Sequence, residues 1–519
     1  MEKEKLNLTL LKEKLNKYNQ MHLLDFLEAN NYDENLYSEI LNIDFDLLGK
    51  IYDNNVIAKK ENKLINYKDV TTLDTMAEIN SFSDYEIKEF KRKGYEAVYQ
   101  GKVALYILAG GQGSRLGSDD PKGMFNIKMP SNKSLFEYLF NRILSCQNLS
   151  KKIVESDNNN IIKFNPSKIL IQTSEENHNQ TVDFLKNNNY FGLDKENVII
   201  FPQDMIYAVD INKKIIIKNE KELFKNPNGN GGCFSTIKNK NILDKCMGNL
   251  KIEALHVTSI DNPLIRVFDP FFLGWYFKNN ILFAAKYIEK VDPNESVGLF
   301  LKYKNLPIML DYGDTPKEIK IEKDNSDKLK YRAGNSLNYL ISVEHLNNIL
   351  NNKEQYEILQ KEYHSALKNI QSFDILTKQN IKVEGYKFEL FFNSIFQFCP
   401  PNNSLSVFES FRDEEFSPVK NKDGDLTCTP SHVRRDMSSL FFKWIEEFVK
   451  QNEKYLELKF FIKDENETII LKDLLNLKYN YLVEIDFTYS YNGENLFTEE
   501  DLLGDKTIKD SKILIKKIN

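Results

Sequence analysis

The chain has 519 residues, of which 41% are hydrophobic and 28% charged, and its formal net charge is −6. This composition is that of a soluble globular protein, and the length predicts two or three domains. The acidic balance argues against a broad basic surface for nucleic acid, and no segment has the length of a membrane span.

The cysteines are scattered and odd in number, without Cys-x-x-Cys spacing, which argues against a disulfide framework or a structural zinc site. They are Cys146, Cys233, Cys246, Cys399 and Cys428. The first 14 residues are too charged for a signal peptide. We therefore expect a cytoplasmic protein that binds neither nucleic acid nor a membrane.

Residues 1 to about 100 are predicted to be a helical region. Leu8, Leu11 and Leu15 recur at helical spacing. A later helix is predicted from Asp84 to Gly94, with Ser83 as its N-cap and Gly94 as its end. No residue pattern in this region points to chemistry.

Residues 101–405 alternate strand and helix patterns, which predicts an α/β sandwich with a largely parallel sheet. Residues 406–519 change character and are predicted to form a small β-rich domain with an Asn-Gly hairpin at Asn492–Gly493. A polar, asparagine-rich stretch at 151–166 is predicted to be a surface loop. The other predicted strands are 103–108, 168–173, 198–201, 254–260, 286–289, 456–462 and 468–471, and the predicted helices are 134–146, 181–187 and 438–450.

A glycine-rich loop follows the first strand of this α/β region. Its glycines allow positive φ and close approach of the backbone to a ligand, and its cations suit a polyphosphate. A tight surface turn is the alternative, but four glycines and two cations directly after a buried strand favour a phosphate-binding loop. The residues concerned are Gly110, Gly111, Gly113, Gly117, Arg115 and Lys122.

This loop departs from the two commonest phosphate-binding patterns. Counting from Gly111, Leu116 occupies the position of the third glycine of the dinucleotide-binding motif. Lys122 lies between Pro121 and Gly123, and not in the Gly-Lys-Ser/Thr order of the Walker motif. A nicotinamide oxidoreductase is therefore disfavoured.

Further candidates lie at the ends of other predicted strands, where ligands bind in such folds. Gln203 follows one strand and Asp261 another, and Gly229 to Gly232 supply more close-approach backbone. Asp261 is the carboxylate at a strand end beside the site, so it is the candidate ligand for Mg²⁺ or Mn²⁺.

The segments Leu108–Gly117 and Pro121–Met124 resemble the signature of the eukaryotic UDP-N-acetylhexosamine pyrophosphorylases. The resemblance extends over nearly the whole chain. It implies a Rossmann-like nucleotide-diphospho-sugar transferase sandwich with an N-terminal helical extension and a small β-rich C-terminal domain. It also implies conversion of UTP and N-acetylglucosamine 1-phosphate into UDP-N-acetylglucosamine and pyrophosphate, by a monomer or homodimer.

Within this resemblance, Arg115, Lys122 and Lys420 are expected to act on phosphates. The expected nucleotide-binding residues are Leu108, Ala109, Gly110, Gly111, Gly113, Gln203 and Gly229. The expected sugar-binding residues are Asn230, Gly298, Asp311, Asn335 and Phe391.

Three positions depart from the family pattern. Asp311 stands where the family usually has glutamate, Asn393 where it has phenylalanine and Ser394 where it has aspartate. The choice among N-acetylglucosamine, N-acetylgalactosamine and glucose 1-phosphate therefore stays open. The alternatives are a UDP-sugar pyrophosphorylase for other hexose 1-phosphates and a non-catalytic nucleotide-sugar-binding protein.

Overall fold

The structure is a computed structural model that describes residues 7–57, 67–73, 76–156, 162–248, 250–359, 362–400, 405–465, 467–498, 501, 507–508 and 512–518. The chain forms two compact units. The larger unit comprises residues 67–202, 241–348 and 396–519, and the smaller comprises 1–66, 203–240 and 349–395. The domain boundaries expected near residues 100 and 405 stay a prediction.

A mixed sheet forms the centre of the larger unit, and in the described residues it has eleven strands. Its main path runs β2-β16-β10-β13-β9-β3-β4-β5, with β1, β11 and β12 off this path. The adjacent strands β9, β3, β4 and β5 are parallel, so their carboxyl ends share one edge. The path strands are β2 (Met76–Ala77), β3 (Val103–Leu108), β4 (Ile169–Thr173), β5 (Val198–Pro202), β9 (Ala254–Ser259), β10 (Phe283–Glu289), β13 (Ala333–Ser342) and β16 (Ser406–Glu409).

The predicted parallel sheet is confirmed in its central part, but β13 runs antiparallel to both β9 and β10. Five predicted strands are observed with shifted ends, and β10 begins earlier than expected. The strands off the main path are β1 (Val70–Thr71), β11 (Leu299–Tyr303) and β12 (Leu306–Leu310).

Helices α6 (Asp84–Tyr99), α7 (Leu135–Glu155) and α11 (Pro270–Lys278) pack their apolar faces into the core cluster that contains β3. Each begins at a side-chain cap, which satisfies an amide that the first turn leaves free. Ser83 and Glu86 form a capping box on α6, Ser134 caps α7, and Asp269 caps α11. The predicted N-cap of α6, Ser83, is therefore confirmed.

Two predicted helix ends were wrong. Gly94 lies inside α6, and the position needs glycine because a Cβ there would meet the backbone oxygen of Pro270 on α11 at 1.9 Å. Helix α7 continues to Glu155, into the stretch predicted to be a loop, because its apolar face continues as far as Val154, which is buried. Residues 157–161 of that stretch lie outside the described residues.

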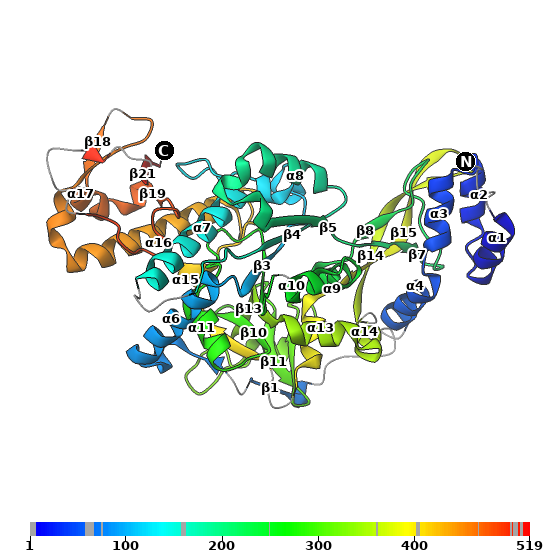
Figure 1. The fold of residues 1–519 in the computed structure, drawn as a ribbon. Helices are drawn as coiled ribbons and strands as arrows, with labels where there is room; N and C mark the ends of the chain where they lie inside the picture. Colours follow the sequence, from blue (N-terminus) through cyan, green and yellow to red (C-terminus); the bar gives the residue numbers. More distant parts are fainter. Residues whose placement is uncertain are drawn as a thin grey trace. The chain divides into compact units, whose positions relative to one another are not determined.

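The C-terminal part of the larger unit has small sheets packed beside a long helix (Figure 1). The sheets are β18-β17-β20 and β19-β21. The predicted hairpin at Asn492–Gly493 was wrong, because the described residues 486–498 around it contain no strand and β19 pairs instead with β21. The elements are α16 (Pro430–Gln451), α17 (Leu471–Asn476), β17 (Lys459–Phe461), β18 (Thr468–Ile470), β19 (Tyr481–Ile485), β20 (Thr507–Ile508) and β21 (Ile513–Lys517).

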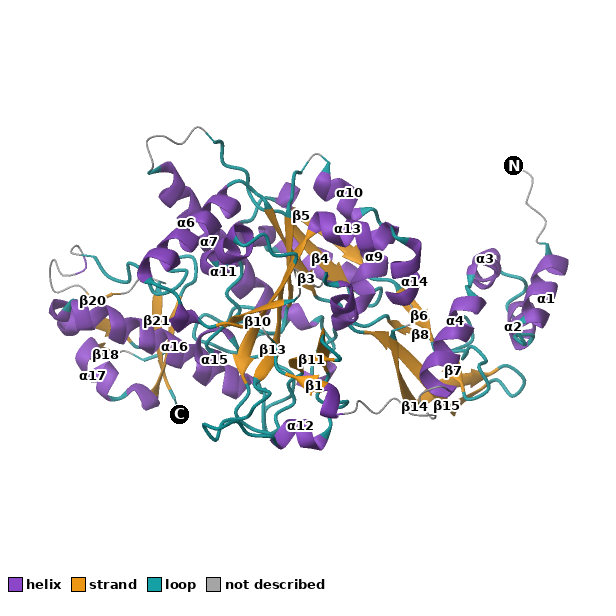
Figure 2. Ribbon diagram, turned by 90° about the horizontal axis from the view of Figure 1, so that it is seen from below, coloured by secondary structure: helices purple, strands orange, loops and turns teal. Residues whose placement is uncertain are grey.

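The smaller unit combines N-terminal helices with a long hairpin of β14 (Tyr363–Asp374) and β15 (Gln379–Leu390), to which β7 (Val209–Asp210) adds an edge strand (Figure 2). Gln20 and His22 hydrogen-bond the backbone of residues 213–215, which ties the helices to this unit. Its other elements are α1 (Leu8–Lys17), α2 (His22–Ala29), α3 (Glu34–Asn42), α4 (Phe45–Tyr52), β6 (Met205–Tyr207), β8 (Lys225–Pro227) and α9 (Cys233–Asn239).

The remaining α-helices of the described residues are short, and each lies between two strands in chain order. They are α8 (His178–Asn187), α10 (Ile242–Met247), α12 (Lys317–Ile321), α13 (Val343–Asn351), α14 (Lys353–Leu359) and α15 (Arg412–Glu415). Within the described residues, no helix combines the length and the apolar composition that crossing a bilayer requires.

Replacing Gly274 by alanine tests the close crossing of α6 and α11. A Cβ at Gly274 would meet the backbone oxygen of Phe90 at 1.7 Å, so the helices would have to separate. We expect the free energy of unfolding to fall by about 1–3 kcal/mol, the range for overpacked cores. Denaturant unfolding measures the loss. The control is Gly49→Ala on α4, where nothing lies within 4 Å of the added methyl group; equal loss in both variants would contradict the crossing.

The buried ring of His256 predicts that acid lowers the free energy of unfolding of the larger unit. The ring is fully buried in β9; Nε2 lies 2.7 Å from Asn338 Oδ1, and Nδ1 accepts from the Phe268 amide at 3.1 Å. Burial lowers its pKa to about 4. The ring of the unfolded chain has a pKa of about 6.5. Between about pH 6.5 and pH 4 the unfolded ring is therefore protonated while the folded ring stays neutral.

Stability is thus fully present above pH 6.5 and falls progressively toward pH 4, by at most about 1.4 kcal/mol per pH unit for one such group. In His256→Gln this contribution is absent, so we expect a flatter stability curve over that window. Urea unfolding of both proteins at several pH values measures the difference. Parallel curves would contradict the assignment.

Candidate active site

The glycine-rich loop leaves the half-buried end of β3 at Leu108 and is fastened by Asn177. Asn177 is fully buried, and its Nδ2 donates to the carbonyl oxygens of Ala109 at 3.0 Å and Gly111 at 3.3 Å. The carbonyl and the following amide of a trans peptide point in opposite directions. The amides of Gly110 and Gln112 therefore point away from Asn177, which makes them available to an anion.

The second half of the loop closes on itself. The amide of Gly113 donates to Asp120 O at 2.9 Å, and the amide of Lys122 donates to Gly111 O at 3.1 Å. Gly117 has φ of +76°, which suits glycine. The amide of Gly113 is thus bonded within the turn. Arg115 is exposed on the short helical turn between Gly113 and Gly117.

Lys122 and Asp261 form an ion pair at the carboxyl edge of the sheet. Lys122 Nζ donates to Asp261 Oδ2 at 3.1 Å, and the Ser259 hydroxyl donates to Oδ1 at 2.5 Å. Both charged side chains keep 17% exposure, so a ligand can reach them. Burial by itself raises the pKa of Asp261, but the positive charges of Lys122 and Lys420 outweigh it and lower this pKa.

The segment before Lys420 is hydrogen-bonded to the chain around Asp261. Val419 donates its amide to Asp261 O at 2.8 Å, and Ser417 donates its amide to Asn262 Oδ1 at 3.0 Å. Asn262 Nδ2 in turn donates to Glu415 O at 2.7 Å. Two residues far apart in the sequence, Asp261 and Lys420, are thereby brought to one place, with the Lys420 side chain exposed.

Three expected sugar-binding positions also lie in the larger unit. The amide of Asn335 donates to Gly298 O at 2.8 Å. The side-chain oxygen of Asn335 accepts from the Leu337 amide and the Tyr339 hydroxyl, both at 2.9 Å. Asp311 accepts from the Gly313 amide at 2.9 Å, so one of its oxygens closes a local turn.

Four expected positions, Gln203, Gly229, Asn230 and Phe391, lie in the smaller unit. A side chain at Gly229 would meet Leu390 O at 2.5 Å, and Asn230 Oδ1 accepts from the Phe392 amide at 2.8 Å. Phe391 stacks on His364 with ring centroids 4.1 Å apart. Gln203, which follows β5 in the sequence, is buried in the same unit.

The sequence reasoning missed several supporting residues, namely Asn177, Ser259, Asn262 and His364. Asn262 directly follows Asp261, so its polar side chain after a strand end was a usable signal. The roles of the others depend on pairing across the fold and have no local pattern. No group of three or more metal-binding side chains is found among the described residues.

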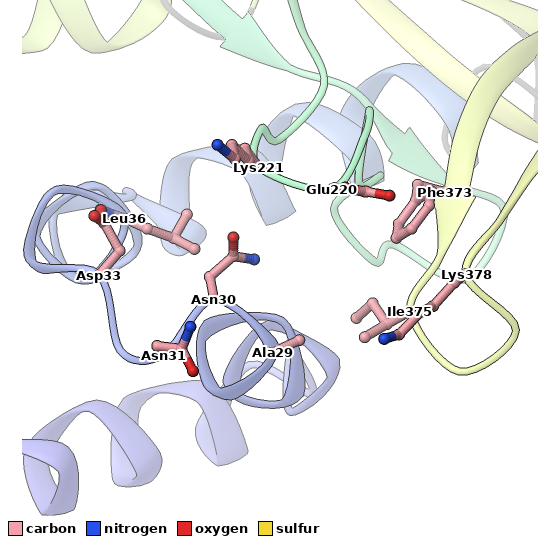
Figure 3. A pocket seen from close by; sticks show the side chains of 10 residues that line it. All are labelled: Ala29, Asn30, Asn31, Asp33, Leu36, Glu220, Lys221, Phe373, Ile375 and Lys378. Carbon is pink, nitrogen blue, oxygen red and sulfur yellow. The ribbon is translucent and has the colours of Figure 1, made fainter.

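A separate pocket of about 550 Å³ lies in the smaller unit, between the N-terminal helices and the tip of the β14–β15 hairpin (Figure 3). Its charged side chains are mixed in sign: Asp33 and Glu220 face the same space as Lys221 and Lys378. None of the expected site residues lines it. It lacks the net positive charge that binding a polyphosphate requires.

Known proteins of one family are similar to this chain in sequence and in fold. The family model described as UTP–glucose-1-phosphate uridylyltransferase matches residues 46–468. UDP-N-acetylglucosamine pyrophosphorylase of Saccharomyces cerevisiae is 32% identical over 79% of this chain and 78% of its own, and UDP-N-acetylglucosamine diphosphorylase 2 of Arabidopsis thaliana is 33% identical over 68% of each.

A crystal structure of the uridine diphosphate N-acetylglucosamine pyrophosphorylase of Trypanosoma brucei superimposes with a TM-score of 0.78 and 25% identity, covering 96% of this chain and 95% of that one. The family match extends over most of the chain and includes both the glycine-rich loop and the Lys420 segment. The chain therefore belongs to the UTP–glucose-1-phosphate uridylyltransferase family, and within it to the UDP-N-acetylglucosamine pyrophosphorylases.

Proposed function

We propose that this chain transfers a uridylyl group from UTP to N-acetylglucosamine 1-phosphate and releases pyrophosphate. The observation that carries the proposal is the meeting of Lys122, Asp261 and the Lys420 segment beside a glycine-rich loop. The family membership supplies the substrate class, because the relatives are named for UDP-N-acetylglucosamine.

In this reaction a phosphate oxygen of the sugar phosphate attacks the α-phosphorus of UTP, and pyrophosphate leaves in line with the new bond. The nucleophile is already an anion, so no general base is required. The work of the protein is to bring anions together and to stabilise charge on phosphoryl oxygens. We assign Lys122 to the α-phosphate, Arg115 to the leaving pyrophosphate and Lys420 to the sugar phosphate.

The backbone of the loop holds the nucleotide in this proposal. Gly110 and Gly111 allow close approach of the backbone, and the Asn177 contacts orient the amides of Gly110 and Gln112. Gln203 is assigned to the edge of the uracil base. Gly229 is assigned to the nucleotide. The residues assigned to the sugar are Asn230, Gly298, Asp311, Asn335 and Phe391.

Asp261 fits a divalent cation such as Mg²⁺ or Mn²⁺. Its carboxylate is partly exposed and carries oxygen donors of the kind that Mg²⁺ prefers. Magnesium commonly takes one or two carboxylates together with substrate phosphates, so a single aspartate is a sufficient protein donor. When bound, the metal neutralises developing charge on phosphate oxygens. Ser259 and Lys122 hold the carboxylate in place.

A cytoplasmic location and a monomeric or homodimeric state remain predictions from the sequence. So does the identity of the sugar, because the departures at Asp311 and Asn393 fall in segments assigned to it. A uridylyltransferase for glucose 1-phosphate is the second candidate, because the family model carries that description.

Removing the lysine charges tests the phosphate assignments. We expect Lys122→Ala and Lys420→Ala each to lower turnover by roughly a hundredfold or more, the usual effect of losing one charge-stabilising donor. Pyrophosphate release from UTP, N-acetylglucosamine 1-phosphate and Mg²⁺ measures turnover. The control is Lys323→Ala, which removes an exposed lysine paired with Asp327. Unchanged turnover in both site variants would refute the assignments.

A substrate panel tests the sugar and the base. We expect the highest kcat/KM for UTP with N-acetylglucosamine 1-phosphate, and lower values with glucose 1-phosphate or with ATP in place of UTP. The departures at the sugar positions make N-acetylgalactosamine 1-phosphate the informative competitor. Pyrophosphate release is measured for each pair at equal enzyme concentration. A folded protein that releases pyrophosphate with none of them would contradict the proposed function.

A further inference from the structure

Lys286 is a fully buried lysine that the proposed reaction does not use. It lies on β10 with 1% of its side chain exposed. Its Nζ donates to Asp269 Oδ2 at 2.6 Å and to Glu415 Oε1 and Oε2 at 2.8 and 2.6 Å. A buried ammonium group is costly unless it is paired and hydrogen-bonded, and here both requirements are met.

The two partners of Lys286 belong to different elements. Asp269 caps α11 through the Phe271 amide at 3.0 Å. Burial by itself raises the pKa of Asp269, but Lys286 and Arg266 outweigh it and lower this pKa to about 2. Glu415 ends α15 and is 5% exposed, so three separated stretches of chain meet at one ammonium group.

Glu415 begins the segment that carries Lys420. The backbone of Glu415, Ser417 and Val419 is bonded in turn to Asn262 and Asp261, as described above. Lys420 follows directly, with its amide bonded to Cys428 O at 2.8 Å. The ion cluster of Lys286 with Asp269 and Glu415 holds the buried start of the segment. The bond from the Val419 amide to Asp261 O holds its end.

We propose that Lys286, through Glu415, is a positioning residue for Lys420. The inference deepens the proposed function and rests on it, because it assigns the buried ion cluster a task in holding a phosphate-binding lysine. Replacing buried ion clusters by apolar groups is often neutral for stability, so stability alone does not explain an ion cluster here. Positioning of Lys420 does explain the cluster, since a displacement of about 1 Å in a reacting group can lower the rate by a hundredfold.

A double-mutant cycle between Glu415→Gln and Lys420→Ala tests the coupling. Glutamine keeps the shape and the backbone bond to Asn262 but loses the charge that binds Lys286 and that lies 3.6 Å from Arg266. We expect Glu415→Gln to lower kcat roughly 10- to 100-fold in the normal chain, and less than about twofold further when Lys420 is already alanine. An equal fold-loss of kcat with Lys420 present and with Lys420→Ala would overturn the proposal. A general structural defect would lower kcat by the same factor whether or not Lys420 is present.

The matched control is Asp413→Asn, the same change of carboxylate to amide on α15, at a side chain 68% exposed and paired with Lys443. It should leave kcat unchanged. Lys286→Met serves as a second variant with the same expected cycle. If neither Glu415→Gln nor Lys286→Met folds, by thermal unfolding, the cluster serves the core as a whole and the positioning role is refuted.

Amide hydrogen exchange separates this inference from the proposed reaction, because it needs no turnover. Glu415→Gln should speed exchange at the Ser417 and Val419 amides, which are bonded to Asn262 and Asp261, while Asp413→Asn should not. Unchanged protection in Glu415→Gln would refute the positioning role even in an active enzyme. Faster exchange in a chain that releases no pyrophosphate would instead contradict only the proposed function.

Discussion

The ion pair between Lys122 and Asp261 is the contact on which the proposed chemistry depends. It joins the end of the glycine-rich loop after β3 to the turn after β9, and these two strands are direct neighbours in the sheet. Because parallel strands end at a common edge, two residues 139 positions apart come within 3.1 Å. The pair keeps both charges partly exposed, so a ligand can reach either of them.

Each partner of that pair has its own support. Asn177 holds the loop from below through two carbonyl oxygens, and Ser259 holds the carboxylate. Asn262 holds the segment that brings Lys420. These supports are neutral polar groups, which orient the backbone without adding charge to a site that must collect anions.

The larger unit also buries an ion cluster below this surface. Lys286 lies between Asp269 and Glu415, while Arg266 pairs with Glu414 at 2.7 Å. Such a cluster is poor evidence for stability, because desolvation of the charges offsets much of their attraction. It joins β10, α11 and α15 at one ammonium group, and Glu415 of α15 stands at the start of the Lys420 segment.

The sequence by itself determined the strand at β3, the glycine-rich loop with Lys122, the N-cap of α6, and the family. Each of these depends on local sterics, periodicity or a contiguous motif, so neighbouring residues suffice to define it. The tertiary structure alone decided that Gly94 lies within a helix, that β13 runs antiparallel, that Asn177 bonds the loop backbone and that Lys286 pairs with two buried carboxylates. The physical reason is that these features are fixed by partners remote in the chain: a carbonyl on α11, two flanking strands, a loop backbone and a pair of buried carboxylates.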